Sequence, residues 1–312
     1  MLAPWTIEEM NDADLKDKRL NDRLTQVLSQ LDGHPTASIP AGCGGHAELT
    51  GAYRLFDNEK VNFDNVLQPH IESTRRRVAD QSTVLLVQDT TEIDLTRPEQ
   101  QVAGAGRLDG GARRGLFLHP LHAFTPDGTP LGTLQATVWT RDEPAPPAAE
   151  RSALRKHTPI EEKESQRWVD MLRHAREEAR RNSETQFVCL ADSEADIYEL
   201  FAEAEEEPGE IDWIVRACQN RALQPQGEKT PENAESDAAE TNRVREQVLK
   251  QGVLFTHTIN VRGRTAKVAC EQRGWNGQPD TASAEVGGKP GIAFNRPRRA
   301  PVAGRLSSKA RV

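Results

Sequence analysis

The first eighty residues carry apolar side chains at helical spacing. Asp12 and Asp14 suit the start of a helix, and aliphatic residues then recur every three or four positions at Leu15, Leu20, Leu24, Val27, Leu28 and Leu31. Glycines and prolines over residues 33–45 predict a loop, and further helices are expected over about 47–56 and 63–78. Short helices with scattered basic residues are typical of DNA-binding modules, and a packing or dimerisation role fits equally well.

From residue 83 the pattern changes to short apolar runs of strand length, separated by turn signals and by one long amphipathic stretch. The predicted order is strand 83–89, strand 116–124, strand 131–139, helix 160–181, strand 187–191, helix 194–206 and strand 212–216. Three strands followed by alternating helices and strands predict a mixed α/β domain with one central sheet.

Two of these strands stop at an acidic residue, Asp89 after the first and Asp192 after the fourth. Because functional groups gather at the carboxyl ends of strands in such sheets, we expect the two carboxylates to lie together. They would repel one another without a cation, and Mg²⁺ takes one or two carboxylates together with water and phosphate oxygens. The pair predicts metal-dependent phosphoryl or nucleotidyl chemistry, although either aspartate could instead cap a helix or form a turn.

The last third of the sequence has a weaker pattern. Residues 224–241 are rich in Glu, Pro, Asn and Ala and predict an exposed or disordered insertion. Runs at 253–261 and 265–270 predict a β-hairpin. Residues 273–312 have no sustained period and contain eight Lys or Arg against two Asp or Glu, which is typical of a solvated basic tail. A segment translated out of its reading frame would look the same.

Composition narrows the class only slightly. The 312 residues carry a net charge of −8, so the chain has no global basic signature, although a local basic groove can lie on an acidic protein. No apolar run of membrane-spanning length and no signal peptide is found, so we expect a cytoplasmic protein. The four cysteines are far apart, and we expect reduced thiols rather than disulfides or zinc ligands.

Several segments together resemble the DDE transposases of the insertion-sequence-four family. They occur in the order in which that family has them, over residues from about 5 to 270. Each segment is modest alone, and the set is specific. The segments are 15–19 (LKDKR), 51–58 (GAYRLFDN), 88–91 (QDTT), 162–168 (EKESQRW), 191–197 (ADSEADI) and 213–216 (WIVR).

The resemblance implies a ribonuclease-H-like catalytic core behind a helical domain that binds transposon ends. It implies Mg²⁺ or Mn²⁺ as cofactor, double-stranded DNA at the transposon ends and target as partner, and cut-and-paste transfer in a synapsed homodimer. Asp89 and Asp192 match the first two catalytic, metal-binding aspartates, and Arg216 matches an arginine that handles phosphates. The implied domains are 1–80 (DNA binding), 81–216 (catalytic core), 217–272 (the start of a β-rich insertion) and 273–312 (tail).

The sequence departs from the family pattern at the third catalytic carboxylate. That residue is a glutamate on a helix with Tyr, Arg and Lys, whereas Glu271 and Glu285 lie outside any amphipathic pattern. The departure suggests a truncated or frameshifted product that diverges near Arg273. Two hypotheses therefore stand beside one another: an active transposase, and an inactive remnant that binds DNA or inhibits a full-length subunit. A nucleic-acid hydrolase unrelated to transposition is a third.

The expected DNA contacts come from two groups of basic residues, which would mostly touch phosphates and make binding salt-dependent. In the helical region the candidates are Arg19, Arg23, Arg54 and the cluster 75–77. After the first strand they are Arg107, Arg113 and Arg114. Each of these could also be an ordinary solvated arginine.

Overall fold

The computed structural model describes residues 2–97, 99–110, 112–141, 157–206, 209–223, 243–250, 256–261, 282–287 and 292–294. Its internal contacts divide the chain into two compact units. The first contains Met1–Ile214 and Phe294–Ala300, and the second contains Val215–Ala293 and Pro301–Val312.

Helices form the N-terminal part of the first unit, as the periodicity predicted: α1 (Pro4–Glu9), α2 (Lys18–Asp32), α3 (Ile39–Gly42), α4 (His46–Phe56) and α5 (Phe63–Ala79). Local sequence explains where they start. The Asp17 carboxylate caps α2 by accepting from the Arg19 amide at 2.9 Å, and Asn62 and Asn65 form a reciprocal capping box on α5. The apolar faces of α2 and α4 bury a small core of Leu15, Leu24, Val27, Ala52 and Leu55.

One mixed sheet contains β1 (Thr83–Gln88), β2 (Thr91–Asp94), β3 (Gly106–Arg107), β4 (Arg114–Phe124), β5 (Pro130–Trp139), β6 (Gln186–Ala191) and β7 (Asp212–Arg216). All of these residues belong to the first unit except the last two of β7. The central order is β7-β6-β1-β4, and β2, β3 and β5 also pair with β4. Strand β4 is antiparallel to β1 and β5, whereas β6 is parallel to β1. The mixed sheet is therefore the one predicted, with the short β2 and β3 as unpredicted additions.

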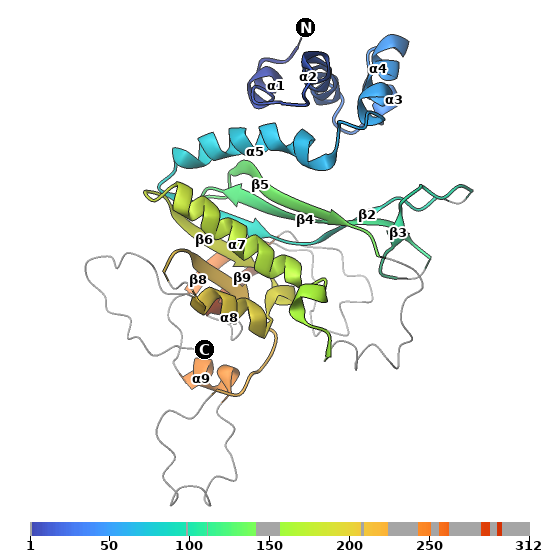
Figure 1. The fold of residues 1–312 in the computed structure, drawn as a ribbon. Helices are drawn as coiled ribbons and strands as arrows, with labels where there is room; N and C mark the ends of the chain where they lie inside the picture. Colours follow the sequence, from blue (N-terminus) through green and yellow to red (C-terminus); the bar gives the residue numbers. More distant parts are fainter. Residues whose placement is uncertain are drawn as a thin grey trace, which may run out of the picture. The chain divides into compact units, whose positions relative to one another are not determined.

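Helix α7 (Gln166–Arg181) packs on one face of this sheet (Figure 1). Its buried stripe includes Trp168, Met171, Leu172 and Ala175, and His119 of β4 meets Trp168 edge to face at 4.6 Å. Residues two apart on a strand share a face, so Phe117 and Leu121 point toward the helix as well. Burying a leucine of this kind contributes about 2 kcal/mol. Helix α8 (Tyr198–Glu206) packs against α7.

Two helices begin later than the sequence predicted. Residues Ile160–Glu162 form a separate 3₁₀ turn, η1, because Lys163 is extended and interrupts the helix before α7 begins at Gln166. Residues Ser193–Ala195 form a second 3₁₀ turn, η2, and α8 begins only at Tyr198. The charged residues in both places predict the first turn of a helix, and the structure has a separate 3₁₀ turn there instead.

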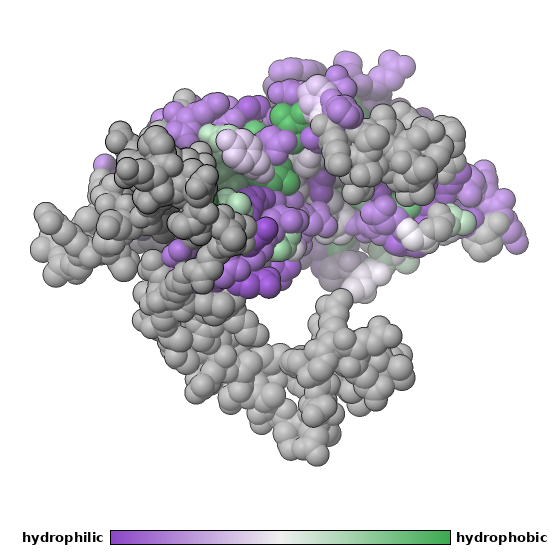
Figure 2. Space-filling model, turned by 90° about the horizontal axis from the view of Figure 1, so that it is seen from below, coloured by the Kyte–Doolittle hydropathy of each residue, from purple (hydrophilic) through white to green (hydrophobic). Residues whose placement is uncertain are grey.

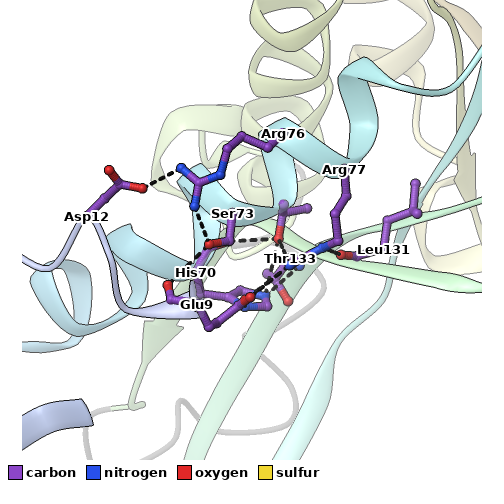
Figure 3. A network of polar contacts seen from close by, with 9 residues as sticks. Glu9, Asp12, His70, Ser73, Arg76, Arg77, Leu131 and Thr133 are labelled. Carbon is purple, nitrogen blue, oxygen red and sulfur yellow. Dashed lines mark hydrogen bonds and ion pairs between the residues drawn. The ribbon is translucent and has the colours of Figure 1, made fainter. Parts of the chain in front are cut away.

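Helix α5 is fixed to β5 and to α1 by a polar network (Figure 3). The Arg77 guanidinium pairs with Glu9 of α1 at 2.7 Å and donates from Nε to the Leu131 carbonyl at 2.6 Å. His70 contacts the same Glu9 carboxylate, and its Nε2 accepts from the Thr133 amide at 2.9 Å. The N-terminal helices are thereby tied to the sheet through α5.

The second unit contains α9 (Val244–Lys250), β8 (Thr256–Val261), β9 (Ala282–Gly287) and most of β10 (Ile292–Phe294). Strand β8 pairs antiparallel with β9, with Ile259 opposite Ala284. Strand β8 lies within the first run, 253–261, of the predicted hairpin. The sequence did not predict β9, because its small residues give a weak strand signal. Residues 265–270 lie outside the described residues, as does the insertion predicted at 224–241.

Hydrophilic side chains cover most of the described surface on the face that Figure 2 draws, around a small group of hydrophobic ones. Among the described residues, no helix combines the length and apolar character that a membrane crossing needs. Among the described residues, Cys43, Cys189 and Cys218 form no disulfide, and Cys189 is buried in β6. Cys270 lies outside the described residues.

Candidate active site and DNA interface

The register of β1 and β6 brings the two predicted aspartates to the same edge of the sheet. These strands are parallel neighbours, and their last paired residues are Gln88 and Ala191. Asp89 directly follows Gln88 and Asp192 directly follows Ala191. The two aspartates therefore stand at equivalent positions, just beyond the ends of adjacent strands. Hydrogen-bonded strands lie about 4.8 Å apart, which is a spacing that one hydrated cation can bridge.

Each aspartate has a local hydrogen bond that orients it. Asp89 is exposed, and its Oδ1 accepts from the Thr90 amide at 2.8 Å. Asp192 is the N-cap of η2 and accepts from the Glu194 amide at 2.7 Å. The capping role considered for Asp192 is thus correct.

An arginine that sequence reasoning did not single out joins the two strand ends. Arg167, on the first turn of α7, donates from Nε to Thr90 Oγ1 at 2.8 Å and from Nη2 to Glu194 at 2.9 Å. Its Nη1 donates to the Glu164 carbonyl at 2.7 Å, and the guanidinium lies 5.4 Å from the Trp139 ring centroid. The side chain is only 14 % exposed. Arg167 lies in the segment 162–168, which carries part of the family resemblance, but its contacts with the two strand ends depend on the tertiary fold.

Beneath the two aspartates a buried hydrogen-bond chain runs across the sheet. Thr90 Oγ1 contacts His119 Nδ1 at 2.9 Å, His119 Nε2 contacts the Gln88 side-chain oxygen at 3.2 Å, and the Gln88 amide donates to Cys189 Sγ at 3.3 Å. Burial, together with the charge of Arg167, lowers the pKa of His119 to about 3. His119 is therefore neutral at physiological pH. A polar side chain at an inward position of a strand needs hydrogen-bond partners. The inward positions of Gln88 and His119 in their strands are therefore the sequence signal that could have revealed this chain.

The described residues contain no group of three or more Asp, Glu, His or Cys side chains arranged to hold a metal. Two carboxylates at a sheet edge still suit Mg²⁺, which keeps several water or phosphate ligands. Of the late glutamates, Glu285 lies in β9 of the second unit and Glu271 lies outside the described residues.

Arg216 is the last residue of β7, whose bounds are those that the sequence predicted, and its side chain is exposed. Gln186 at the start of β6 donates to Asp212 at the start of β7 at 2.8 Å, so both strands begin at one edge. Strand β7 crosses the division between the two units after Ile214. The part of Arg216 in the site stays a prediction.

Most of the arginines proposed to bind DNA have partners within the protein. The cluster 75–77 stabilises packing, with Arg75 paired to Glu178 of α7 at 2.5 Å and Arg76 paired to Asp12. Arg113 pairs with Glu92 at 2.7 Å and with Asp94 at 2.9 Å. Arg19 pairs with Asp17 at 3.3 Å while 91 % exposed, Arg107 lies in β3 and Arg114 begins β4.

Arg23 and Arg54 differ, because neither forms an ion pair with any residue that the structure describes. Arg23 of α2 lies against α4, where a Cβ added to Gly51 would meet its Nη1 at 2.5 Å. Gly51 and Arg54 are three residues apart and so lie on neighbouring positions of one helix face. Tyr53 and Phe56, 50 % and 45 % exposed, border a shallow hollow with Arg54. The two arginines and these aromatic rings form a surface that we call the α2–α4 face.

The class defined so far is an α/β protein with a helical N-terminal region and a mixed sheet. Comparison with protein families makes this more specific, since residues 2–61 match the model of the transposase DNA-binding family. The matched stretch contains helices α1 to α4 and with them the α2–α4 face. The match supports a transposase that binds DNA through this region. No curated protein matches the chain.

Proposed function

We propose that the protein is a DDE transposase of the insertion-sequence-four family, with a ribonuclease-H-like core that cuts and joins DNA. The observation that carries this proposal is the β1–β6 register, which sets Asp89 and Asp192 side by side in a chain whose first sixty residues match a transposase DNA-binding family. Fold and sequence match come from different parts of the chain and point to the same class.

The sheet topology supports the ribonuclease-H-like assignment. Strands β5, β4 and β1 form an antiparallel meander, and β6 then adds parallel to β1 after the helix α7. A parallel neighbour requires such a crossover helix. In this arrangement the first and fourth long strands carry the aspartates at their carboxyl ends, which is where open sheets place their sites.

In the proposed reaction the chain's own residues hold and orient the substrate. When bound, Mg²⁺ or Mn²⁺ supplies activation of a water or hydroxyl and stabilisation of the leaving oxygen. Asp89 and Asp192 would hold the metal through carboxylate oxygens, and the hydrogen bonds that they accept from the Thr90 and Glu194 amides would orient them. Arg216, at the carboxyl end of β7, would contact the DNA phosphates.

The proposed DNA-binding surface is the α2–α4 face. Arg23 and Arg54 have no internal ion pair among the described residues to compete with phosphate, and Tyr53 can pack against the sugar-phosphate backbone. Arg19, Arg113 and Arg114 remain secondary candidates. The partner is double-stranded DNA, at the transposon ends and at the target, bound by a synapsed homodimer in the bacterial cytoplasm.

A second candidate is an inactive protein that binds DNA only. The observation that favours it is that Glu285 lies on β9 and not on a helix, so it does not match the family's third carboxylate. Such a protein would bind transposon ends and inhibit an active transposase.

The deciding experiment is cleavage of a duplex that carries the transposon end, with Mg²⁺ or Mn²⁺. The element's own terminal sequence is compared with a scrambled duplex, and wild type with Asp89→Asn and Asp192→Asn. Nicking that requires the end sequence, the metal and both aspartates supports the transposase. End-specific binding without nicking supports the second candidate, and cleavage of both duplexes alike indicates a general nuclease.

A further inference from the structure

The two aspartates lie on separate strands, and the hydrogen bonds of the sheet end just before them. Gln88 and Ala191 are the last paired residues of β1 and β6, so the ladder between these strands does not extend to the two aspartates. A side chain that joins both segments beyond the last pair is therefore placed to affect the geometry of the proposed metal site.

Arg167 is placed to do this. Its Nε reaches Thr90, the residue after Asp89, and its Nη2 reaches Glu194, two residues after Asp192. The Nη1 bond to the Glu164 carbonyl and the nearby rings of Trp139 and Trp168 hold the planar guanidinium in one orientation. A guanidinium presents its donors in a rigid fork, which an ammonium group cannot reproduce.

The buried chain beneath Arg167 holds Thr90 from its inner side. Thr90 Oγ1 accepts from Arg167 Nε at 2.8 Å and also contacts His119 Nδ1 at 2.9 Å. His119 Nε2 in turn faces the Gln88 side-chain oxygen at 3.2 Å, and the Gln88 amide donates to Cys189 Sγ. The Thr90 side chain is therefore held between Arg167 and the buried ring of His119.

We propose that Arg167 is a positioning residue that sets the separation of the Asp89 and Asp192 carboxylates by joining the ends of β1 and β6. This role rests on the proposed metal site. A positioning role and a purely electrostatic role predict opposite changes in metal affinity when Arg167 is removed. A positive charge beside two carboxylates competes with a metal ion, so removing the charge alone would strengthen metal binding. Loss of the bridge between the two strand ends would instead weaken metal binding.

The test is binding of Mn²⁺ alone to the full chain, measured by calorimetry and by the loss of the free-ion electron paramagnetic resonance signal. Arg167→Ala is expected to weaken Mn²⁺ binding at least tenfold. Arg167→Lys should give a similar loss, because one ammonium group cannot reach both strand ends. Thr90→Val changes no charge and nearly preserves shape, and it should weaken Mn²⁺ binding several-fold.

Arg141→Ala is the matched control. Arg141 is comparably buried and pairs with Glu164 and Asp109 at 2.6 Å, but it contacts neither strand end. Its Mn²⁺ affinity should equal that of wild type. Circular dichroism and duplex binding show which variants remain folded, and Thr90→Val decides the question if Arg167→Ala does not fold.

Unchanged or tighter Mn²⁺ binding in folded Arg167→Ala, with Thr90→Val like wild type, would overturn the positioning role and leave the metal site standing. If the wild-type protein binds no Mn²⁺, or if Asp89→Asn binds Mn²⁺ as tightly as wild type does, the metal site itself is overturned, and the role of Arg167 with it. The two failures are therefore distinguishable.

Discussion

Glu9 of α1 and Arg77 of α5 form an ion pair of 2.7 Å across 68 positions of sequence. Only 11 % of the Glu9 side chain is exposed. Burial by itself would raise the pKa of Glu9, but the hydrogen bonds and charges of Arg77 and His70 outweigh it and hold that pKa below the usual range. Because α1 lies in the stretch that matches the DNA-binding family and α5 packs on β5, this pair connects DNA-binding helices to the sheet (Figure 3).

Replacing this carboxylate should make the protein less stable in a pH-dependent way. Glu9→Gln keeps the shape and removes the charge, and we expect it to lower the free energy of unfolding by about 2 kcal/mol at pH 7. A carboxyl whose pKa is lowered in the folded state contributes its full stability above its unfolded pKa of about 4.3, and loses it as the pH falls through the folded value. Urea unfolding at several pH values measures this.

The neighbouring exposed Glu8 provides the control, since Glu8→Gln should unfold like wild type. A gap between wild type and Glu9→Gln that stays constant as the pH is lowered below 4 would contradict the assignment of the stabilisation to the ionised carboxylate.

Arginines of α5 and α4 should give opposite results when they are removed. Arg75 is paired to Glu178, whose side chain is only 5 % exposed, so Arg75→Ala would leave a buried carboxylate without its main partner. We expect a loss of about 3 kcal/mol in unfolding free energy, with unchanged DNA affinity of the folded fraction.

Arg54→Ala should leave the unfolding midpoint within experimental error and weaken DNA binding. Thermal unfolding and fluorescence anisotropy on the same preparations separate the two effects, and a DNA-binding loss in Arg75→Ala larger than in Arg54→Ala would refute this division.

The sequence predicted the sheet and the paired aspartates because both depend on local signals. Apolar runs of strand length mark β1 and β6, and each run is followed directly by its aspartate. Parallel pairing of the two strands is then enough to bring both aspartates to one edge of the sheet. The helix α7 was also predicted from its apolar stripe, apart from its first turn, where Lys163 adopts an extended conformation.

Partnerships between distant side chains could not be predicted in the same way. Arg75 and Glu178 are 103 positions apart, and nothing local distinguishes Arg75 from Arg54. The same limit hid Arg167, which reaches Thr90 from 77 positions away. A basic residue in a sequence can serve phosphate or carboxylate, and only the fold shows which carboxylates are near. The strand β9 was missed for a different reason, since its small side chains give almost no hydrophobic signal.

Buried His119 should give the protein a second pH dependence, in a higher range than that of Glu9. Its pKa of about 3 in the folded state lies below the unfolded value of about 6.5. Between these values the unfolded chain binds the extra proton, so stability decreases as the pH falls from about 6.5 toward 3, by up to about 1.4 kcal/mol per pH unit. His119→Gln should lose that slope, whereas His46→Gln, at an exposed position of α4, should retain it. Equal slopes in wild type and His119→Gln would show that another group causes the acid sensitivity.

If DNA binds to the α2–α4 face, its affinity should depend on salt concentration in a way that can be calculated. If Arg23 and Arg54 each neutralise one phosphate, each substitution by Gln removes about one released counterion from binding. The slope of log K against log salt concentration should then become shallower by about 0.9 per variant, and by about 1.8 in the double variant. Lys18, which pairs with Asp22 at 2.6 Å on another turn of α2, supplies the control as Lys18→Gln.

Tyr53→Ala provides a further distinction on the same face. A tyrosine that packs against the DNA backbone carries no charge, so its removal should lower the affinity at every salt concentration without changing the slope. The measurement is anisotropy titration of a labelled duplex between 50 and 200 mM salt, which are the ordinary limits for such slopes. Equal slopes for wild type and the Arg23→Gln, Arg54→Gln double variant would place the DNA on another surface. Arg19, Arg113 and Arg114 would then be the next residues to substitute.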